Sequence, residues 1–244
     1  MRTIRRGYLP EYEELFGPQA VPVLREAAID ALFLMNRGYN LKRAVYIAME
    51  HYQLSEMQRV ALSRSLDPDK TVQMRQKSRL NREDLCEKTV YIDGFNAIIL
   101  MESVVSESPI FRCLDGSIRD LANLKGSYKI IDKTEPGIRL ILSQLAKLHV
   151  AKAIINIDSP VSNSRNLKVL ILQLAEDYPV DVEVNLIDAC DKSFYDKEFV
   201  ITGDSVVLDN VKSWAPFYSW IVEDYQTDHR VWLIDFIALK PYLS

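Results

Sequence analysis

From residue 88 onward, the chain alternates short β-branched apolar runs with longer segments of helical periodicity. The runs are TVYID, KAIINID, VDVEVNLID, EFVIT and RVWLID, at 89–93, 152–158, 180–188, 198–202 and 230–235. Between them, EPGIRLILSQLAKLH and SRNLKVLILQLAEDY repeat apolar residues at helical spacing. Strands that alternate with helices predict an α/β domain with a mostly parallel central sheet over residues 88–244.

The first 66 residues predict a small all-α bundle. A helical pattern that starts near residue 20 ends near Gly38, and Asn40 and Ser55 are suited to cap the two helices that follow. Those last two helices have two interpretations. They form a helix-turn-helix that offers residues to nucleic acid, namely Gln58, Arg59 and Arg64. Alternatively, they are a plain bundle that packs on its neighbour, which we favour because such helix pairs are common without any DNA role.

Residues 67–87 predict a basic linker or an exposed helix. The segment KTVQMRQKSRLNR, at 70–82, has five basic residues and no acidic one. Such a run is usually a solvated surface. Next to an acidic pocket it would also attract a phosphate backbone, and the sequence leaves both interpretations open.

Composition limits the class of protein. The chain has 244 residues, is 48% hydrophobic, and contains three widely spaced cysteines without a C-x-x-C pair, which favours a reducing, cytoplasmic setting. Neither a signal peptide nor a run of about 18 apolar residues is present, so we expect no membrane partner. The formal net charge of −4 arises in residues 88–244, where acidic residues exceed basic ones by six.

An aspartate follows three of the predicted strands. The dipeptide Asp93-Gly94 is a strong hairpin signal by itself. However, the order of apolar strand, Asp, small residues and helix recurs at Asp158 and Asp204, which indicates strand-to-helix corners. The carboxyl ends of parallel strands meet at one edge of a sheet, so these three carboxylates are expected to converge. The alternative is that each one only caps its helix.

Two of these corners resemble a known superfamily. VYIDGFN and FVITGDSVVLD are similar to the first and last carboxylate motifs of the PIN-like nucleases, especially the NYN branch. The resemblance covers residues 88–240 and implies a three-layer α/β sandwich, metal-dependent cleavage of RNA and a tendency to form homodimers. The architecture also resembles an uncharacterised family of archaea and bacteria that joins a helical domain to a PIN-like domain. Its matching segments are ES (102–103), RCLDGSIRDL (112–121) and DSPVSNSRNL (158–167).

The resemblance also implies roles for individual residues. Asp93 matches the first metal-binding aspartate, Asn96 its hydrogen-bonding companion and Asp204 the late carboxylate, with Thr202 steadying that loop. Asp158 is the next choice for a catalytic, metal-binding acid.

Either Asp115 or Asp120 completes the metal-binding set. The chain departs from the NYN pattern at Val206, which stands where a second acid is common. Asp209 substitutes for that acid, or the site is incomplete.

A carboxylate cluster of this kind implies Mg²⁺ or Mn²⁺ as cofactor, and the resemblance implies RNA as substrate. Clustered carboxylates repel one another and stay ionised around a hard cation that prefers oxygen ligands. The cation activates water, so no protein nucleophile is required. The residues expected to contact substrate are Thr202, Ser205, Ser162, Arg165, Arg112 and Arg119. For the serines and Arg165 near the start of the 164–178 helix, helix capping is the favoured alternative.

The sequence lacks the signature motifs of several other enzyme classes. The three histidines are scattered without HExxH, and the glycine-rich motifs of NTPases, α/β-hydrolases and dinucleotide-binding proteins are missing. The aromatic stretch at 214–232 could stack bases, although core packing is the commoner role for such residues. The main alternative to a nuclease is a catalytically inactive PIN-like domain that binds RNA or a protein partner.

Overall fold

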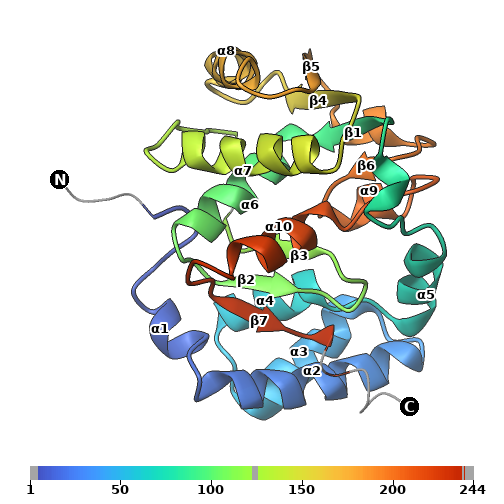
Figure 1. Ribbon diagram of the computed structural model, residues 1–244. Helices are drawn as coiled ribbons and strands as arrows, with labels where there is room; N and C mark the ends of the chain where they lie inside the picture. The colour runs from blue at the N-terminus through green and yellow to red at the C-terminus, as the bar shows by residue number, and fades with distance from the viewer. Residues whose placement is uncertain (1–4, 123–125, 238, 240–244) are drawn as a thin grey trace.

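Four parallel strands form the central sheet (Figure 1). Their order across the sheet is β5 (Asp181–Ile187), β4 (Lys152–Asp158), β1 (Thr89–Asp93) and β6 (Val200–Ile201). The computed structural model describes residues 5–122, 126–237 and 239. Ile92 in β1 pairs with Ile155 on one side and Ile201 on the other. The mixed α/β class with a mostly parallel central sheet, expected from the alternating pattern, is confirmed.

Helices cover one face of this sheet. α6 (Gly94–Val105) follows β1, α7 (Thr134–Lys147) precedes β4, and α8 (Ser164–Ala175) follows β4. Their apolar faces meet the strands around Ile98, Ile141 and Ile171. On the other face, the 3-10 helix η2 (Asp191–Phe194) and the short α9 (Ser205–Leu208) build a smaller apolar cluster with Val200. β1 and β6 are therefore covered on both faces, whereas β5 at the edge of the sheet fully buries only Val184.

The corner between β1 and α6 is a strand-to-helix turn and not a hairpin. Gly94 is the first residue of α6 and lies against β4. A Cβ atom there would lie 2.8 Å from Ile157 Cγ1 and 2.9 Å from the Asn156 carbonyl oxygen. Glycine is thus required by this close approach, and the "DG" dipeptide reflects packing between neighbouring strands.

A second sheet lies between the central sheet and the N-terminal helices (Figure 1). It contains β3 (Ile118–Asp120), β2 (Ile110–Arg112) and β7 (Leu233–Asp235) in that order. β2 pairs antiparallel with β3 and parallel with β7. The RVWLID run is therefore a strand, as predicted, but it belongs to this separate sheet.

The aromatic stretch before β7 is mainly core. Trp214 is fully buried, and α10 (Phe217–Tyr225) buries Phe217, Tyr218 and Trp220. The four rings are inaccessible to a base, so core packing and not stacking is their role.

The N-terminal helices are α1 (Tyr12–Leu15), α2 (Ala20–Asn36), α3 (Leu41–Tyr52) and α4 (Glu56–Ser65). Both predicted caps are confirmed. Asn40 Oδ1 accepts a hydrogen bond from the Arg43 N–H at 2.9 Å, and Ser55 forms a capping box with Gln58. The bundle shares its apolar core with the second sheet, since Leu24 and Leu62 belong to one cluster with Phe111 and Ile234.

Residues 67–87 contain α5 (Asp69–Lys77) and the 3-10 helix η1 (Glu83–Leu85), so the helix and not the linker is found, although it is not exposed on all sides. Arg75, in the middle of α5, is 1% exposed and forms ion pairs. The residues that the helix-turn-helix interpretation offers to nucleic acid are also placed differently from what that interpretation requires. Gln58 is buried and donates to the Leu15 carbonyl, and Arg64 donates to the Asp120 carbonyl at 2.6 Å. Of Gln58, Arg59 and Arg64, the first and the last therefore contact the rest of the protein, as the plain-bundle interpretation requires.

Two further properties bear on the setting of the protein. Within the described residues, no helix combines the length and apolarity needed to cross a membrane. All three cysteines carry free thiols, with Cys86 exposed and the other two, Cys113 and Cys190, buried.

Candidate functional site

A cavity of about 430 Å³ opens at the carboxyl edge of the central sheet. Five aspartates line it, and four of them stand at the end of a different central strand or beyond it: Asp93 (β1), Asp158 (β4), Asp191 (after β5) and Asp204 (after β6). The second sheet and α4 provide further lining residues, among them Asp120, Ser63 and Arg64. The topology therefore brings together Asp93, Asp158 and Asp204, as the strand-end pattern predicted.

Asp93 is the most buried of the four. It is 6% exposed, and its two carboxylate oxygens accept hydrogen bonds from the Asn96 N–H at 3.4 Å and the Thr202 hydroxyl at 3.2 Å. Burial raises the pKa of Asp93 to about 7, although both hydrogen bonds act against this rise, and the charges of Asp191 and Asp204 add to it. Asp93 is thus poised to change its protonation state near neutral pH.

Asn96 and Thr202 fix the loop that carries Asp204. Asn96 Oδ1 accepts from the Gly203 N–H at 2.8 Å, and Thr202 Oγ1 accepts from the Asp204 N–H at 3.0 Å. Asp204 Oδ1 in turn accepts from the first N–H groups of α9, at 2.7 and 3.0 Å. Asp93 and Asp204 are therefore helix caps and cavity-lining acids at once, so both interpretations of the strand-end pattern hold.

Asp158 and Asp191 form the other side of the acidic wall. Asp158 Oδ1 accepts from the Cys190 N–H at 3.4 Å, and burial raises the pKa of Asp158. The pKa of Asp191 is also raised, first by burial and then by the charges of Asp204 and Asp158. Asp191 was not among the predicted site residues, because it lies four residues beyond the end of β5. The signal that could have identified it is its position after a strand, since strand ends share one edge of the sheet.

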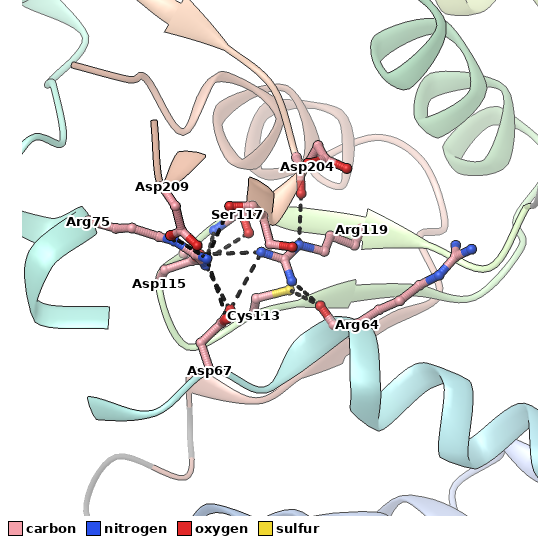
Figure 2. Close-up of polar contacts among 12 residues, drawn as sticks. Arg64, Asp67, Arg75, Cys113, Asp115, Ser117, Arg119, Asp204 and Asp209 are labelled. Atoms are coloured by element: carbon pink, nitrogen blue, oxygen red, sulfur yellow. Dashed lines mark hydrogen bonds and ion pairs between the residues drawn. The ribbon is translucent and has the colours of Figure 1, made fainter. Parts of the chain in front are cut away.

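Asp115 lies outside the cavity, in a buried ion-pair cluster (Figure 2). Arg75 Nη1 donates to Asp115 Oδ2 and to Asp67 Oδ2, both at 2.7 Å. Although burial acts to raise the pKa of Asp115, the charge of Arg119 and the hydrogen bonds from Ser117 hold it below its usual value. Of the two aspartates offered to complete the metal-binding set, Asp115 is thus paired with arginines, and Asp120 is the one that lines the cavity.

The same arginines hold the loop that carries Asp204 from behind (Figure 2). Arg119 Nε donates to the Gly203 carbonyl at 2.8 Å, and Arg75 Nη2 donates to the Ser205 carbonyl at 3.3 Å. Arg75 also pairs with Asp209 at 2.8 Å, so Asp209 does not take the place of the acid missing at Val206. Arg119 lines the cavity, but its hydrogen bonds make it a support for the loop.

The remaining expected substrate contacts divide into two groups. Ser205 lines the cavity, and Thr202 acts through Asp93. The others lie elsewhere. Arg112 pairs with Asp235 at 3.3 Å, and Ser162 hydrogen-bonds the backbone of Tyr128. Arg165 is exposed on α8 and is not among the residues that line the cavity.

Asp120 has a distinct environment at the border of the cavity. It is 8% exposed, and burial raises its pKa to about 6, although the nearby Arg64 acts to lower it. Asp120 Oδ1 accepts from the Ala122 N–H at 2.6 Å. The carboxylate of Asp120 and the guanidinium of Arg64 are therefore the contribution of the second sheet and α4 to a cavity whose other acids come from the central sheet.

The acidic wall fits a hard divalent cation. As the side chains stand in the described ranges, no group of three or more Asp, Glu, His or Cys residues forms a ready-made metal cage. Mg²⁺ does not need one, since it keeps several waters and is usually held by one or two carboxylates together with substrate phosphates. The residues that line the cavity include carboxylates but no histidine or cysteine, a ligand set that favours Mg²⁺ or Mn²⁺ over Zn²⁺.

Comparison with known proteins places this α/β fold and its acidic cavity in a defined family. Residues 82–220 match the model described as "Domain of unknown function (DUF5616)", and residues 23–77 match "Protein of unknown function (DUF434)". An uncharacterized protein of Methanocaldococcus jannaschii is 34% identical over 191 residues, which cover 78% of this chain and 91% of that protein. The chain therefore belongs to the DUF5616 family. No solved structure gives a significant match.

Proposed function

We propose that the protein is a metal-dependent ribonuclease that hydrolyses RNA phosphodiesters in the acidic cavity. The observation that carries this proposal is the convergence of four aspartates from four strand ends on one cavity of about 430 Å³. The resemblance of VYIDGFN and FVITGDSVVLD to PIN-like nuclease motifs supports the same activity. Asp93, Asn96, Thr202 and Asp204, which carry that resemblance, are hydrogen-bonded to one another through side chains and the 203–204 backbone.

The charge of the cavity is the reason for a cation. Five aspartates line the cavity together with two guanidiniums, and both guanidiniums are already engaged. Arg64 Nη1 donates to the Asp120 carbonyl, and Arg119 Nε donates to the Gly203 carbonyl. Such a surface repels a phosphodiester unless a cation balances it. A divalent cation bound there supplies neutralisation of the phosphate charge and lowers the pKa of the attacking water.

The protein residues have separable roles in this scheme. One or two of Asp158, Asp191 and Asp204 would hold the cation through carboxylate oxygens, with water and substrate oxygens as its other ligands. Asp93, whose position is fixed by Thr202 and by its cap on α6, would add a carboxylate oxygen when ionised. Asn96 sets the distance between the β1 and β6 corners through the Gly203 N–H. Water is the nucleophile, so no side chain becomes covalently modified.

Cleavage of end-labelled single-stranded RNA tests the proposal. Wild type is compared in Mg²⁺, Mn²⁺ and EDTA with Asp191→Asn and Asp204→Asn. The matched control is Asp181→Asn, because Asp181 is an exposed aspartate at the opposite edge of the same sheet. We expect metal-dependent cleavage by wild type and the control, and loss of cleavage in the two cavity variants. Equal activity in all four folded proteins, or activity that survives EDTA, would refute the proposal.

A second candidate is an inactive domain that binds RNA or a protein. One observation favours it, namely that Asp93 and Asp204 each cap a helix, a structural role that needs no catalysis. Calorimetric titration with Mn²⁺ separates the candidates. The nuclease requires binding that Asp191→Asn weakens, whereas the inactive module predicts no such binding. We also propose a cytoplasmic setting, which the three free thiols support.

A further inference from the structure

A second hollow, of about 490 Å³, lies on the N-terminal bundle between α3 and α4. Neither the acidic cavity nor the arginine cluster includes any of its residues. It is lined by Asn40, Lys42, Arg43, Tyr46, Met49, Glu56 and Arg59, which together we term the α3–α4 groove.

The α3–α4 groove is basic, although the chain as a whole has a net charge of −4. It holds three cations and one carboxylate, and that carboxylate, Glu56, is already paired with Arg59. Lys42 and Arg43 are exposed, and no carboxylate of the described residues lies within 4.0 Å of either charge. Two uncompensated cations at one hollow provide a binding surface for phosphates.

An exposed aromatic ring lies beside these cations. Tyr46 is 55% exposed, one turn along α3 from Lys42, and Met49 continues the same side of the helix. A tyrosine that is not needed for the core offers its face for stacking. Cations interleaved with an accessible ring are typical of surfaces that bind single-stranded nucleic acid, where bases stack and phosphates pair with basic residues.

One face of α4 connects the α3–α4 groove to the acidic cavity. Arg59 lines the groove and Ser63 lines the cavity, and these residues are one turn apart on the same side of the helix, about 6 Å along its axis. The hydroxyl of Ser63 is buried and has no hydrogen-bond partner among the described residues.

We propose that the α3–α4 groove binds the segment of single-stranded RNA that leads into the acidic cavity. Phosphates pair with Lys42 and Arg43, and a base stacks on Tyr46. This inference rests on the proposed ribonuclease function for its substrate, but binding in the groove is measurable without cleavage. A single strand is favoured over a duplex because stacking on Tyr46 needs an unpaired base.

The test is fluorescence anisotropy with a labelled oligouridylate in EDTA, which prevents cleavage and metal-assisted binding in the cavity. Lys42→Glu and Tyr46→Ala are compared with Lys168→Glu, a lysine on α8 at the far end of the molecule (Figure 1). We expect Tyr46→Ala to weaken binding by roughly five- to a hundredfold. We expect Lys42→Glu to lower the slope of log K against log salt by about 0.7. Lys168→Glu should behave as wild type.

The results for binding in the groove and for cleavage in the cavity are separate, so one proposal can fail while the other stands. Binding that depends on Lys42 and Tyr46 without any cleavage in Mn²⁺ would support the groove and refute the nuclease. Cleavage together with equal affinities for all variants would refute the groove alone. If wild type does not bind the oligouridylate, the groove is not an RNA site. The same holds if Lys42→Glu weakens the binding of polyglutamate, used as a simple polyanion, but leaves the binding of RNA unchanged.

Discussion

The buried carboxyl group of Asp93 should make the stability of the protein depend on pH in a way that Asp93→Asn removes. In the folded protein burial raises the pKa of Asp93 from 3.8 to about 7. Between about pH 4 and pH 7 the folded protein therefore keeps a proton that the unfolded chain has lost. The free energy of unfolding must fall as the pH rises through this range.

The size of the effect follows from the two pKa values. The difference between 3.8 and about 7 corresponds to about 4 kcal/mol of stability, fully present below about pH 4 and lost above about pH 7. Asparagine is uncharged, and its carbonyl oxygen keeps the cap to the Asn96 N–H. Relative to wild type, Asp93→Asn should therefore gain about 4 kcal/mol between pH 4 and pH 8, or roughly 8–16 °C in melting temperature at the higher pH.

Urea unfolding of both proteins in EDTA, at intervals from pH 4 to pH 8.5, measures this difference directly. Subtracting wild type from the variant cancels the titration of groups that both proteins share. We expect the difference to rise through the range and to level off above about pH 7. A difference that stays constant with pH would refute the reasoning, because Asp93 would then have an ordinary pKa and no unfavourable burial.

Three further substitutions test the supporting structure. Arg75→Met leaves Asp115 buried without its cation, so urea unfolding should show a loss of about 3–5 kcal/mol, and a loss below about 1 kcal/mol would contradict the ion-pair cluster. Gly94→Ala forces a Cβ against Ile157, so the melting curve should indicate a loss of about 1–3 kcal/mol, whereas an unchanged curve would exclude the close approach. Ser55→Ala removes the α4 capping box and should lower the free energy of unfolding, measured in urea, by about 1 kcal/mol. An unchanged free energy of unfolding would count against the cap.

The strand-end acids were predictable because their signals are local. Asp93, Asp158 and Asp204 each follow a short apolar run, and parallel strands place such positions at one edge. The helix caps at Asn40 and Ser55 were predictable for the same reason, since each cap is a residue type next to an apolar pattern. In these places, a few neighbouring residues carry the whole signal.

The role of Arg75 was not predictable, because its partners are distant in sequence. A run of basic residues without acids suggests a solvated linker, yet Arg75 is buried against Asp115 and Asp209, 40 and 134 residues away. For the same reason, the sequence could not decide between Asp115 and Asp120 as the further cavity acid. Both lie in LDGSIRDL, and only the packing of β3 on α4 decides that Asp120 faces the cavity while Asp115 faces the arginines.

The second sheet was also beyond the local pattern. β2 and β3 are three residues each, too short for a periodic signal, and β7 was assigned to the main alternation of strands and helices. β2 pairs with β7 across more than a hundred residues, so this contact belongs to the tertiary structure alone. The second sheet also shares its apolar core with the N-terminal bundle, whose helix α4 carries Arg64 at the cavity.

The most direct test of the proposed chemistry is metal rescue with a sulfur-substituted RNA. A phosphorothioate at the cleaved linkage places sulfur where the cation would contact the phosphate, and Mg²⁺ binds sulfur poorly while Mn²⁺ accepts it better. Cleavage rates are compared for oxygen and sulfur RNA in each metal. The account predicts that sulfur slows cleavage in Mg²⁺ and that Mn²⁺ restores the rate. Equal rates for both RNAs in both metals would contradict a cation acting on the phosphate in this cavity.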